Sequence, residues 1–233
     1  LRTASRLNGI IATSTWLKDH QELLQLISPT TQLIEVSQAV LKASLTTVQP
    51  DGVASLFPLD ALPKCDHNPE FVLALDRLQD PGNLGNLFRT ALAAEVEIVW
   101  LASGVDPLNP KVIRASSGAV LHLPFQQLGV SESEAVSRLE EQLKASSKMG
   151  KQVVGAMVPG FSSERPVLPY WDLDWSKPTV LVLGNEGSGL NPCLQACCTH
   201  LVTLPHGSKV ESLNVASAAV PLLLERRRAK MTT

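Results

Sequence analysis

Cysteines, aromatic residues and long apolar runs are scarce in this sequence. The four cysteines among 233 residues have no regular spacing, unlike the disulfide framework of a small secreted protein. No run approaches the ~18 apolar residues that a membrane-spanning helix needs, and the apolar stretch 215–224 leads into the charged segment ERRR. The first residues do not resemble a signal peptide. We therefore expect a cytoplasmic protein that makes no membrane contact.

An excess of positive charge is also missing, because the formal net charge is −2. Nucleic-acid binders that rely on bulk electrostatics are usually basic, so that class is disfavoured. Recognition of one specific nucleic acid needs only a local basic surface. Candidates for such a surface are Arg89, Lys111, Arg114 and a terminal cluster of Arg226, Arg227, Arg228 and Lys230. The terminal cluster has an equally good alternative role, since cations stabilise the last turn of a helix.

The composition, 44% hydrophobic and 18% charged, is that of an ordinary globular protein. The segment FPLDALPKCDHNP at 57–69 contains three prolines, which prevent a regular element and indicate a linker. We place a domain boundary near residue 68. The expected domains are 1–68, including the linker, and 69–233.

The first domain alternates short helical and extended patterns. We expect a helix over 16–30, a strand over 31–36, a helix capped by Ser37 that ends at 43, and a strand over 53–57. The pattern indicates a small α/β module.

In the second domain, apolar runs such as 71–75 are typical of strands buried on both faces. Expected strands are 71–75, 98–101, 120–124, 152–158, 179–183 and 201–204, and expected helices are 86–94, 110–118, 131–148 and 212–228. Their alternation predicts an α/β fold with a mainly parallel sheet and helices on both faces. Ligands of such sheets bind beyond the carboxyl ends of the strands.

Three loop segments fall at those ends. In the first, DPGNLG at 80–85 predicts a tight turn before the helix that carries Arg89. In the second, VLVLGNEGSGL at 180–190, three glycines follow a strand without matching a phosphate-binding motif. This turn suits an adenosine held by backbone groups. The third is LPHGSKVESLN at 204–214. Each segment alone could be a structural connection, and Ser212 and Asn214 could be helix caps.

Taken in order, the three segments resemble the SpoU (TrmH) family of RNA 2′-O-methyltransferases, within the SPOUT superfamily. The matching motifs are DPGNLG with RTA, then GNEGSGL, then LPH with SLNV, and the resemblance covers residues 70–228. It implies a catalytic domain with a C-terminal trefoil knot, an exception to the rule that chains are unknotted. It also implies S-adenosylmethionine as cofactor and a homodimer with composite active sites.

The resemblance implies the following site residues. The family's functional polar positions fall on Asn83, Arg89, Glu186, Ser212 and Asn214. The cofactor site would be lined by Gly184, Leu204 and Leu213, joined by Leu183, Asn185, Gly189 and Pro205. The sequence departs from the family pattern at His206, where Met is usual, and at Ser208, where Gly is frequent.

The implied reaction joins a ribose hydroxyl to a sulfonium methyl group. A guanidinium stays protonated in proteins, so we expect Arg89 to stabilise the developing alkoxide while the proton leaves to a phosphate oxygen or water. Asn83 and Asn214 would fix the hydroxyl and the loops. Glu186 would orient Arg89 or backbone amides, and Ser212 would position substrate or cap a helix. No metal is needed.

Residues 16–60 look similar to part of a ribosomal-protein-like RNA-binding module found in the rRNA-modifying members. We expect this module to be N-terminally incomplete, because the chain starts at Leu1. The module favours structured rRNA, specifically 23S rRNA, as substrate. The alternatives are the same reaction on tRNA, and a non-catalytic RNA-binding or assembly protein with this fold.

One cluster suggests a metal site on first inspection. Cys193, Cys197, Cys198 and His200 lie within eight residues, but the paired Cys-x-x-Cys spacing of zinc sites is lacking. We expect structural cysteines and no metal.

Overall fold

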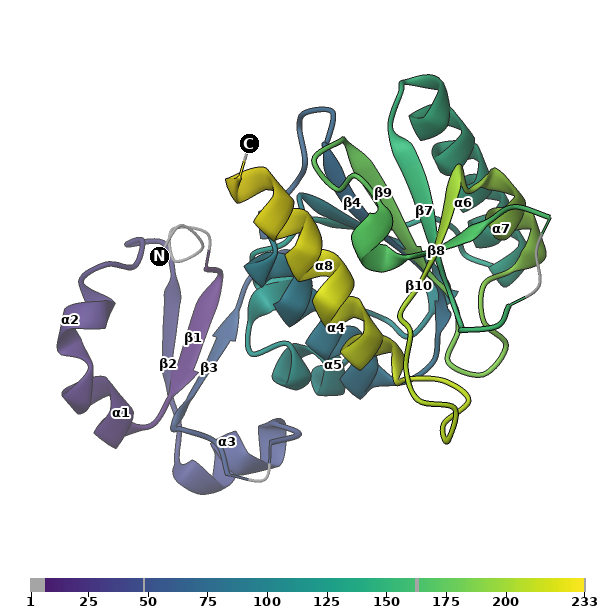
Figure 1. Cartoon of the computed structure of the whole chain (residues 1–233). Coiled ribbons are helices and arrows are strands. Elements are labelled where there is room, and N and C mark those ends of the chain that lie inside the picture. The colour runs from purple at the N-terminus through teal and green to yellow at the C-terminus, as the bar shows by residue number, and fades with distance from the viewer. Residues whose placement is uncertain (1–6, 48, 162–163, 233) are drawn as a thin grey trace. The chain divides into compact units, whose positions relative to one another are not determined.

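The structure, a computed structural model, describes residues 7–47, 49–161 and 164–232. Leu1 therefore lies outside the described residues. The chain divides into two compact units, the first ending at Pro63 and the second beginning at Lys64, and each unit contains its own sheet (Figure 1). The division falls within the proline-marked stretch.

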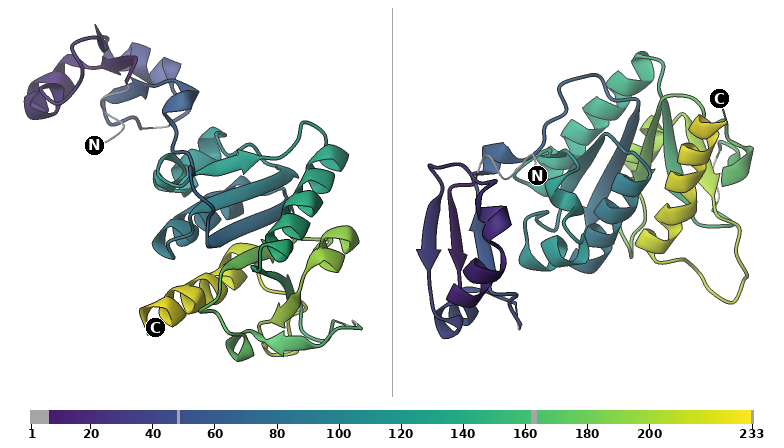
Figure 2. Two further views of the ribbon diagram at one scale, coloured as in Figure 1. Left: turned by 90° about the horizontal axis from the view of Figure 1, so that it is seen from above. Right: turned by 90° about the vertical axis from the view of Figure 1, so that its left-hand side faces the viewer.

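The first unit is built on a three-stranded sheet, whose strands run side by side in the right-hand view of Figure 2. Its central strand β1 pairs in parallel with β2 and antiparallel with β3. The bounds are β1 Gly9–Ala12, α1 Ser14–Asp19, α2 Gln21–Leu24, β2 Gln32–Glu35, α3 Gln38–Ser44, β3 Val53–Leu56 and the 3-10 helix η2 Leu59–Ala61.

The expected helix over 16–30 is wrong in its length. His20 adopts φ −126° and ψ 34°, outside the helical region, and so separates α1 from α2. The strand expected over 31–36 is confirmed as β2, and Ser37 caps α3 by accepting a hydrogen bond from the N–H of Val40. The short strand β1 was not predicted.

The second unit is built on a seven-stranded sheet in the order β6-β5-β4-β9-β7-β10-β8. Every described pair in it is parallel, which confirms the predicted mainly parallel sheet. The strands are β4 Phe71–Leu78, β5 Ile98–Gly104, β6 Phe125–Gln127, β7 Gln152–Met157, β8 Val167–Pro169, β9 Thr179–Leu183 and β10 His200–Thr203.

Helices cover both faces of this sheet, as predicted. The helices are α4 Pro81–Ala93, α5 Pro110–Ala115, α6 Glu132–Lys148, α7 Pro192–Cys197 and α8 Val215–Met231, with 3-10 helices η3 Ala119–Leu121 and η4 Tyr170–Asp172. Two apolar clusters result, one formed with α4, α5 and α8 and the other with α6 and α7. Figure 1 shows α4, α5 and α8 gathered together, apart from α6 and α7.

Three local expectations are wrong, and helix-end chemistry explains the first two. The turn expected at Asp80 is the start of α4, because its side chain caps the helix and Pro81 occupies the first position. The closing helix starts at Val215 behind the cap Asn214, not at Ser212. The strand expected over 120–124 is instead η3 followed by β6. Elements β8 and α7 were not predicted.

The trefoil knot stays a prediction. The sheet order does place β9 between β4 and β7, and β10 between β7 and β8, so the C-terminal strands are inserted among earlier ones. Within the described ranges, no helix has the length and apolar character to cross a membrane.

Candidate active site

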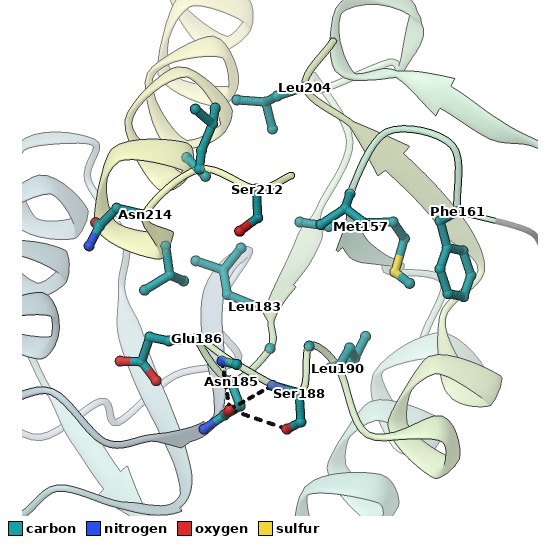
Figure 3. Close-up of a pocket in the computed structure, with 18 of the residues that line it drawn as sticks. Met157, Phe161, Leu183, Asn185, Glu186, Ser188, Leu190, Leu204, Ser212 and Asn214 are labelled. Carbon is teal, nitrogen blue, oxygen red and sulfur yellow. Dashed lines mark hydrogen bonds between the residues drawn. The ribbon is translucent and has the colours of Figure 1, made fainter. Parts of the chain in front are cut away.

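A cavity of about 460 Å³ opens at the carboxyl edge of the seven-stranded sheet (Figure 3). The strands β4, β7, β9 and β10 are parallel, so the segments that follow them meet at this edge. Its lining comes from Asn83 in α4, from 156–159 and Phe161 at and beyond the end of β7, from the loop 183–190, from Gln195 in α7, and from Leu204, His206, 212–215 and Ala218. The three loop segments singled out in the sequence therefore converge on one hollow.

Glu186 joins the second loop to the first. Its carboxylate accepts hydrogen bonds from the backbone N–H groups of Gln79 (3.2 Å) and Asp80 (3.3 Å). It also accepts from the side-chain amide of Asn83, over 3.2 Å. The carboxylate thus fixes the N-terminal end of α4 against the loop that follows β9, which agrees with the expectation that Glu186 orients backbone amides.

Asn83 and Asn214 join the first and third loops. The side-chain amide of Asn214 donates to Oδ1 of Asn83 over 2.8 Å. The remaining oxygen of Asn214 accepts from the backbone N–H groups of Ala216 (3.0 Å) and Ser217 (3.2 Å), and so caps α8. Glu186, Asn83 and Asn214 consequently form one continuous chain of hydrogen bonds across the three motifs.

The glycine-rich loop is held in a tight turn by Asn185. Its side-chain oxygen accepts from the N–H groups of Gly187 (2.9 Å) and Ser188 (3.0 Å) and from the Ser188 hydroxyl (3.2 Å), as the dashed lines in Figure 3 show. Backbone hydrogen bonds of 3.0 Å run in both directions between Asn185 and Gly189. A Cβ on Gly184 would lie 2.7 Å from the carbonyl oxygen of Gly189, so the turn has no room for a side chain there.

The cavity has two unlike sides. Glu186 and Asn214 lie on one side, and Met157 and Phe161 lie on the opposite side (Figure 3). The lining also contains Leu183, Leu190, Leu204, Leu213 and Val215. A ligand in this cavity meets an apolar wall, a glycine-rich backbone and a polar edge of one carboxylate and two amides.

Two predicted residues do not line the cavity. Arg89 is exposed on α4, where its Nη1 donates to the Ser117 hydroxyl over 3.5 Å, and Pro205 is exposed on the third loop. All the other residues predicted for the site are brought together in its lining: Asn83, Leu183, Gly184, Asn185, Glu186, Gly189, Leu204, Ser212, Leu213 and Asn214.

Comparison with known proteins agrees with this geometry. Residues 70–223 match the model of the SpoU rRNA Methylase family. The chain belongs to the SpoU family. This confirms the resemblance found in the three motifs.

Two curated relatives match more than four fifths of the chain. The chain is 40% identical over 195 residues to an uncharacterised tRNA/rRNA methyltransferase of Synechocystis sp., covering 83% of this chain and 66% of that protein. It is 32% identical over 200 residues to the 23S rRNA (guanosine-2′-O-)-methyltransferase RlmB of Pseudomonas aeruginosa, covering 85% and 75%. The chain spans only 57% to 66% of the length of four of the curated relatives that it matches, the Synechocystis protein among them.

The fold is shared with solved SpoU structures. An AdoMet-bound rRNA methyltransferase from Sinorhizobium meliloti matches with a TM-score of 0.73 and 26% identity, over 97% of this chain and 81% of that chain. The similarity extends over both units of the chain.

The segment after β7 was missed by sequence reasoning. Met157, Val158, Pro159 and Phe161 form a wall of the cavity but carry no polar motif. The available signal was positional, because a strand was expected at 152–158 and its carboxyl end had to lie at the ligand-binding edge. Of the two departures from the family pattern, His206 lines the cavity, whereas Ser208 is exposed and does not.

The basic candidates separate into two groups. Arg89, Lys111 and Arg114 are exposed on α4 and α5. In the terminal cluster, by contrast, Arg226 is buried over the Phe71 ring, and the other cations are paired with carboxylates: Arg227 with Glu95, Arg228 with Glu225 and Lys230 with Glu70. The terminal cluster thus serves α8 and its neighbours, which agrees with its alternative role.

The cysteine cluster is spread over different environments. Cys193 is exposed and Cys198 is buried, and desolvation raises the pKa of the Cys198 thiol to about 12. Among the described residues, no three His, Cys, Asp or Glu side chains are grouped as metal ligands.

Proposed function

We propose that this protein transfers a methyl group from S-adenosylmethionine to the 2′-hydroxyl of a ribose in structured RNA, and that 23S rRNA is the substrate. The observation that carries the proposal is the hydrogen-bonded chain Glu186, Asn83, Asn214 beside a cavity walled by the glycine-rich loop. Family membership and the 2′-O-methyltransferase RlmB among the relatives support it.

The cavity has the chemistry that S-adenosylmethionine requires. Its volume lies in the range of small-molecule sites, ~300–1,000 Å³, and its lining offers apolar surface with backbone N–H and C=O groups for an adenosine. No lysine or arginine occurs among the described lining residues, and Glu186 contributes a carboxylate. Such a site suits a sulfonium nucleoside without phosphate. Residues 183–190 and 204–215 would hold it, and when bound it supplies an electrophilic methyl group.

The chain's own residues would then act on the ribose. Asn83 and Asn214 fix the polar edge where the hydroxyl would be received. The guanidinium of Arg89 would stabilise negative charge developing on the ribose oxygen. Proton release goes to a phosphate oxygen or water. The mechanism uses no metal.

Arg89 lies outside the cavity lining of its own chain, which supports the predicted homodimer with composite sites. In such a dimer, the arginine of one copy serves the cavity of the other. Mixed dimers test this point. A dimer of one Arg89→Ala copy and one Gly184→Ala copy should regain the activity of one site, about half that of the wild-type dimer, if sites are composite, because one cavity then has both parts intact.

The exposed cations Arg89, Lys111 and Arg114 would contact the RNA backbone. The first unit, expected to be a ribosomal-protein-like RNA-binding module, favours rRNA over tRNA. We place the protein in the cytoplasm, where that substrate is assembled. The proposed domain limits remain 1–68 and 69–233.

A single experiment tests the activity. Purified protein is incubated with labelled S-adenosylmethionine and either 23S rRNA or tRNA transcripts, and the product is mapped as a ribose resistant to alkaline cleavage. Label in 23S rRNA supports the proposal, and label in tRNA alone supports the alternative substrate. Cofactor binding without methyl transfer to either RNA would favour a non-catalytic assembly protein.

A further inference from the structure

Asp76, which does not line the cavity, is completely buried near the end of β4. Its Oδ1 accepts from Nε of Arg77 over 2.7 Å, and its Oδ2 accepts from Nη2 of the same guanidinium over 3.1 Å. Oδ2 also accepts from the backbone N–H of Asn191 over 2.8 Å. Both carboxylate oxygens are therefore in use. A buried carboxylate costs free energy unless it is paired in this way.

These contacts reach both ends of the glycine-rich loop. Asn191 directly follows Leu190 and caps α7 through its side chain. At the other end, the side-chain amide of Asn185 donates to the carbonyl oxygen of Arg77 over 2.8 Å. The loop 184–190 is thus tied at its start to residue 77 and at its end to residue 76.

Arg77 has a backbone conformation that needs support. Its φ is +55°, a left-handed conformation that is uncommon for residues other than glycine. The sheet pairing passes from Asp76 opposite Ala102 to Leu78 opposite Gly104 and omits Arg77. The guanidinium is held by Asp76 and, at 3.5 Å, by Glu132. Without the buried carboxylate, the conformation that presents the Arg77 carbonyl to Asn185 loses its main restraint.

We infer that Asp76 is a positioning residue for the cofactor loop, acting through Arg77 on Asn185 and directly on Asn191. The inference rests on the proposed function, since the loop is assigned there to S-adenosylmethionine. Asp76 does not touch the cavity. Its effect is to hold the backbone of 184–190 in the shape that lines it.

The test replaces Asp76 by Asn. An amide has one acceptor oxygen and turns an N–H₂ group toward either Arg77 or Asn191, both of which are donors. For Asp76→Asn we expect a rise in the Kd and KM for S-adenosylmethionine of about 10- to 100-fold, the effect of losing a hydrogen bond to a charged acceptor. The KM for RNA, and kcat at saturating cofactor, should change far less. A general loss of folding would lower the active fraction without this split.

Glu97→Ala is the matched control. Glu97 accepts from the backbone N–H groups of Glu70 (3.0 Å) and Phe71 (2.9 Å) at the opposite end of β4. This variant should lose stability in thermal unfolding while keeping the wild-type Kd for the cofactor. A folded Asp76→Asn protein with the wild-type Kd would overturn the inference.

If Asp76→Asn does not fold, a second pair of variants tests the inference. Asn191 has φ −56°, which proline adopts readily. Asn191→Pro removes both the backbone N–H that donates to Asp76 and the side chain that caps α7. Asn191→Ala removes the cap alone. Weaker cofactor binding by the proline variant than by the alanine variant supports the inference, and equal binding contradicts it. If the wild-type protein itself does not bind S-adenosylmethionine, the proposed function fails instead.

Discussion

The side-chain amide of Asn214 donates to Oδ1 of Asn83 over 2.8 Å, although 131 positions separate the two residues. The same Asn83 donates to Glu186 over 3.2 Å, so its amide is oriented from both sides. Asn214 in turn has its oxygen committed to the first N–H groups of α8. The orientation of each amide is therefore fixed by its neighbour, and a change at one end should be felt at the other.

Asn214→Asp separates the two roles of this residue. Aspartate caps helices as well as asparagine does, so α8 and the melting temperature should be preserved. The variant loses the side-chain N–H that donates to Oδ1 of Asn83. A carboxylate oxygen then faces Oδ1 of Asn83, and both of these atoms are acceptors. We expect kcat/KM to fall by at least about tenfold, or roughly 1.4 kcal/mol of transition-state stabilisation. Asn109→Asp, the same change at the N-cap of α5, is the control and should keep full activity. Equal activity in both variants would show that the amide pair is not needed.

Arg89→Ala tests the electrostatic role assigned to the arginine. We expect methyl transfer to fall by ~10²–10³-fold, as when a group that stabilises an oxyanion is removed. Cofactor binding, measured by calorimetry, should stay close to wild type because Arg89 is not in the cavity lining. Arg138→Ala removes a different exposed arginine, paired with Glu134 on α6, and should leave turnover unchanged. Wild-type turnover in Arg89→Ala would exclude the role.

Gly184→Ala tests the close approach in the glycine-rich loop. The new Cβ would lie 2.7 Å from the Gly189 carbonyl oxygen, so the turn must open. Overpacking of this kind costs ~1–3 kcal/mol, and the cofactor Kd should rise correspondingly. Gly207→Ala is the control in the third loop, since a Cβ there meets nothing within 4 Å. The prediction fails if both alanine variants bind the cofactor equally well.

The burial of Cys198 should make the free energy of unfolding depend on pH in the alkaline range. Burial raises the pKa of its thiol from 9.0 to about 12, so between these values the unfolded state releases a proton that the folded state keeps. The stabilisation is complete below pH 9 and is lost as the pH rises toward 12. Denaturant unfolding from pH 8 upward should show a decline that is shallower in Cys198→Ala. In the folded protein at pH 8, mass spectrometry should find iodoacetamide on the exposed Cys193 and not on Cys198; comparable labelling of both would contradict the burial argument.

Sequence patterns predicted the elements that depend on burial. The run 71–75 is apolar because β4 is covered on both faces, and the parallel sheet and its ligand-binding edge followed from such runs. What they could not predict was set by particular side-chain contacts and by the order of the strands. Asp80 opens α4 instead of a turn because its side chain reaches the N–H of Asn83. The wall at Met157 and Phe161 is part of the site only through the order of the strands, and the link from Asp76 to Asn191 joins residues 115 positions apart.

The order of the three loops along the chain also bears on synthesis of the protein. Strands β4 and β5 and helix α4 are translated early, but the cavity then still lacks the loop 184–190 and the lining residues from Leu204 to Ala218, which are translated later. A nascent chain that stops before β9 would contain five strands of the sheet, β4 to β8, and neither the loop 184–190 nor Asn214. Binding of S-adenosylmethionine can therefore stabilise only a polypeptide that already includes these later segments, so newly made protein should gain protease resistance from the cofactor only after they have been translated.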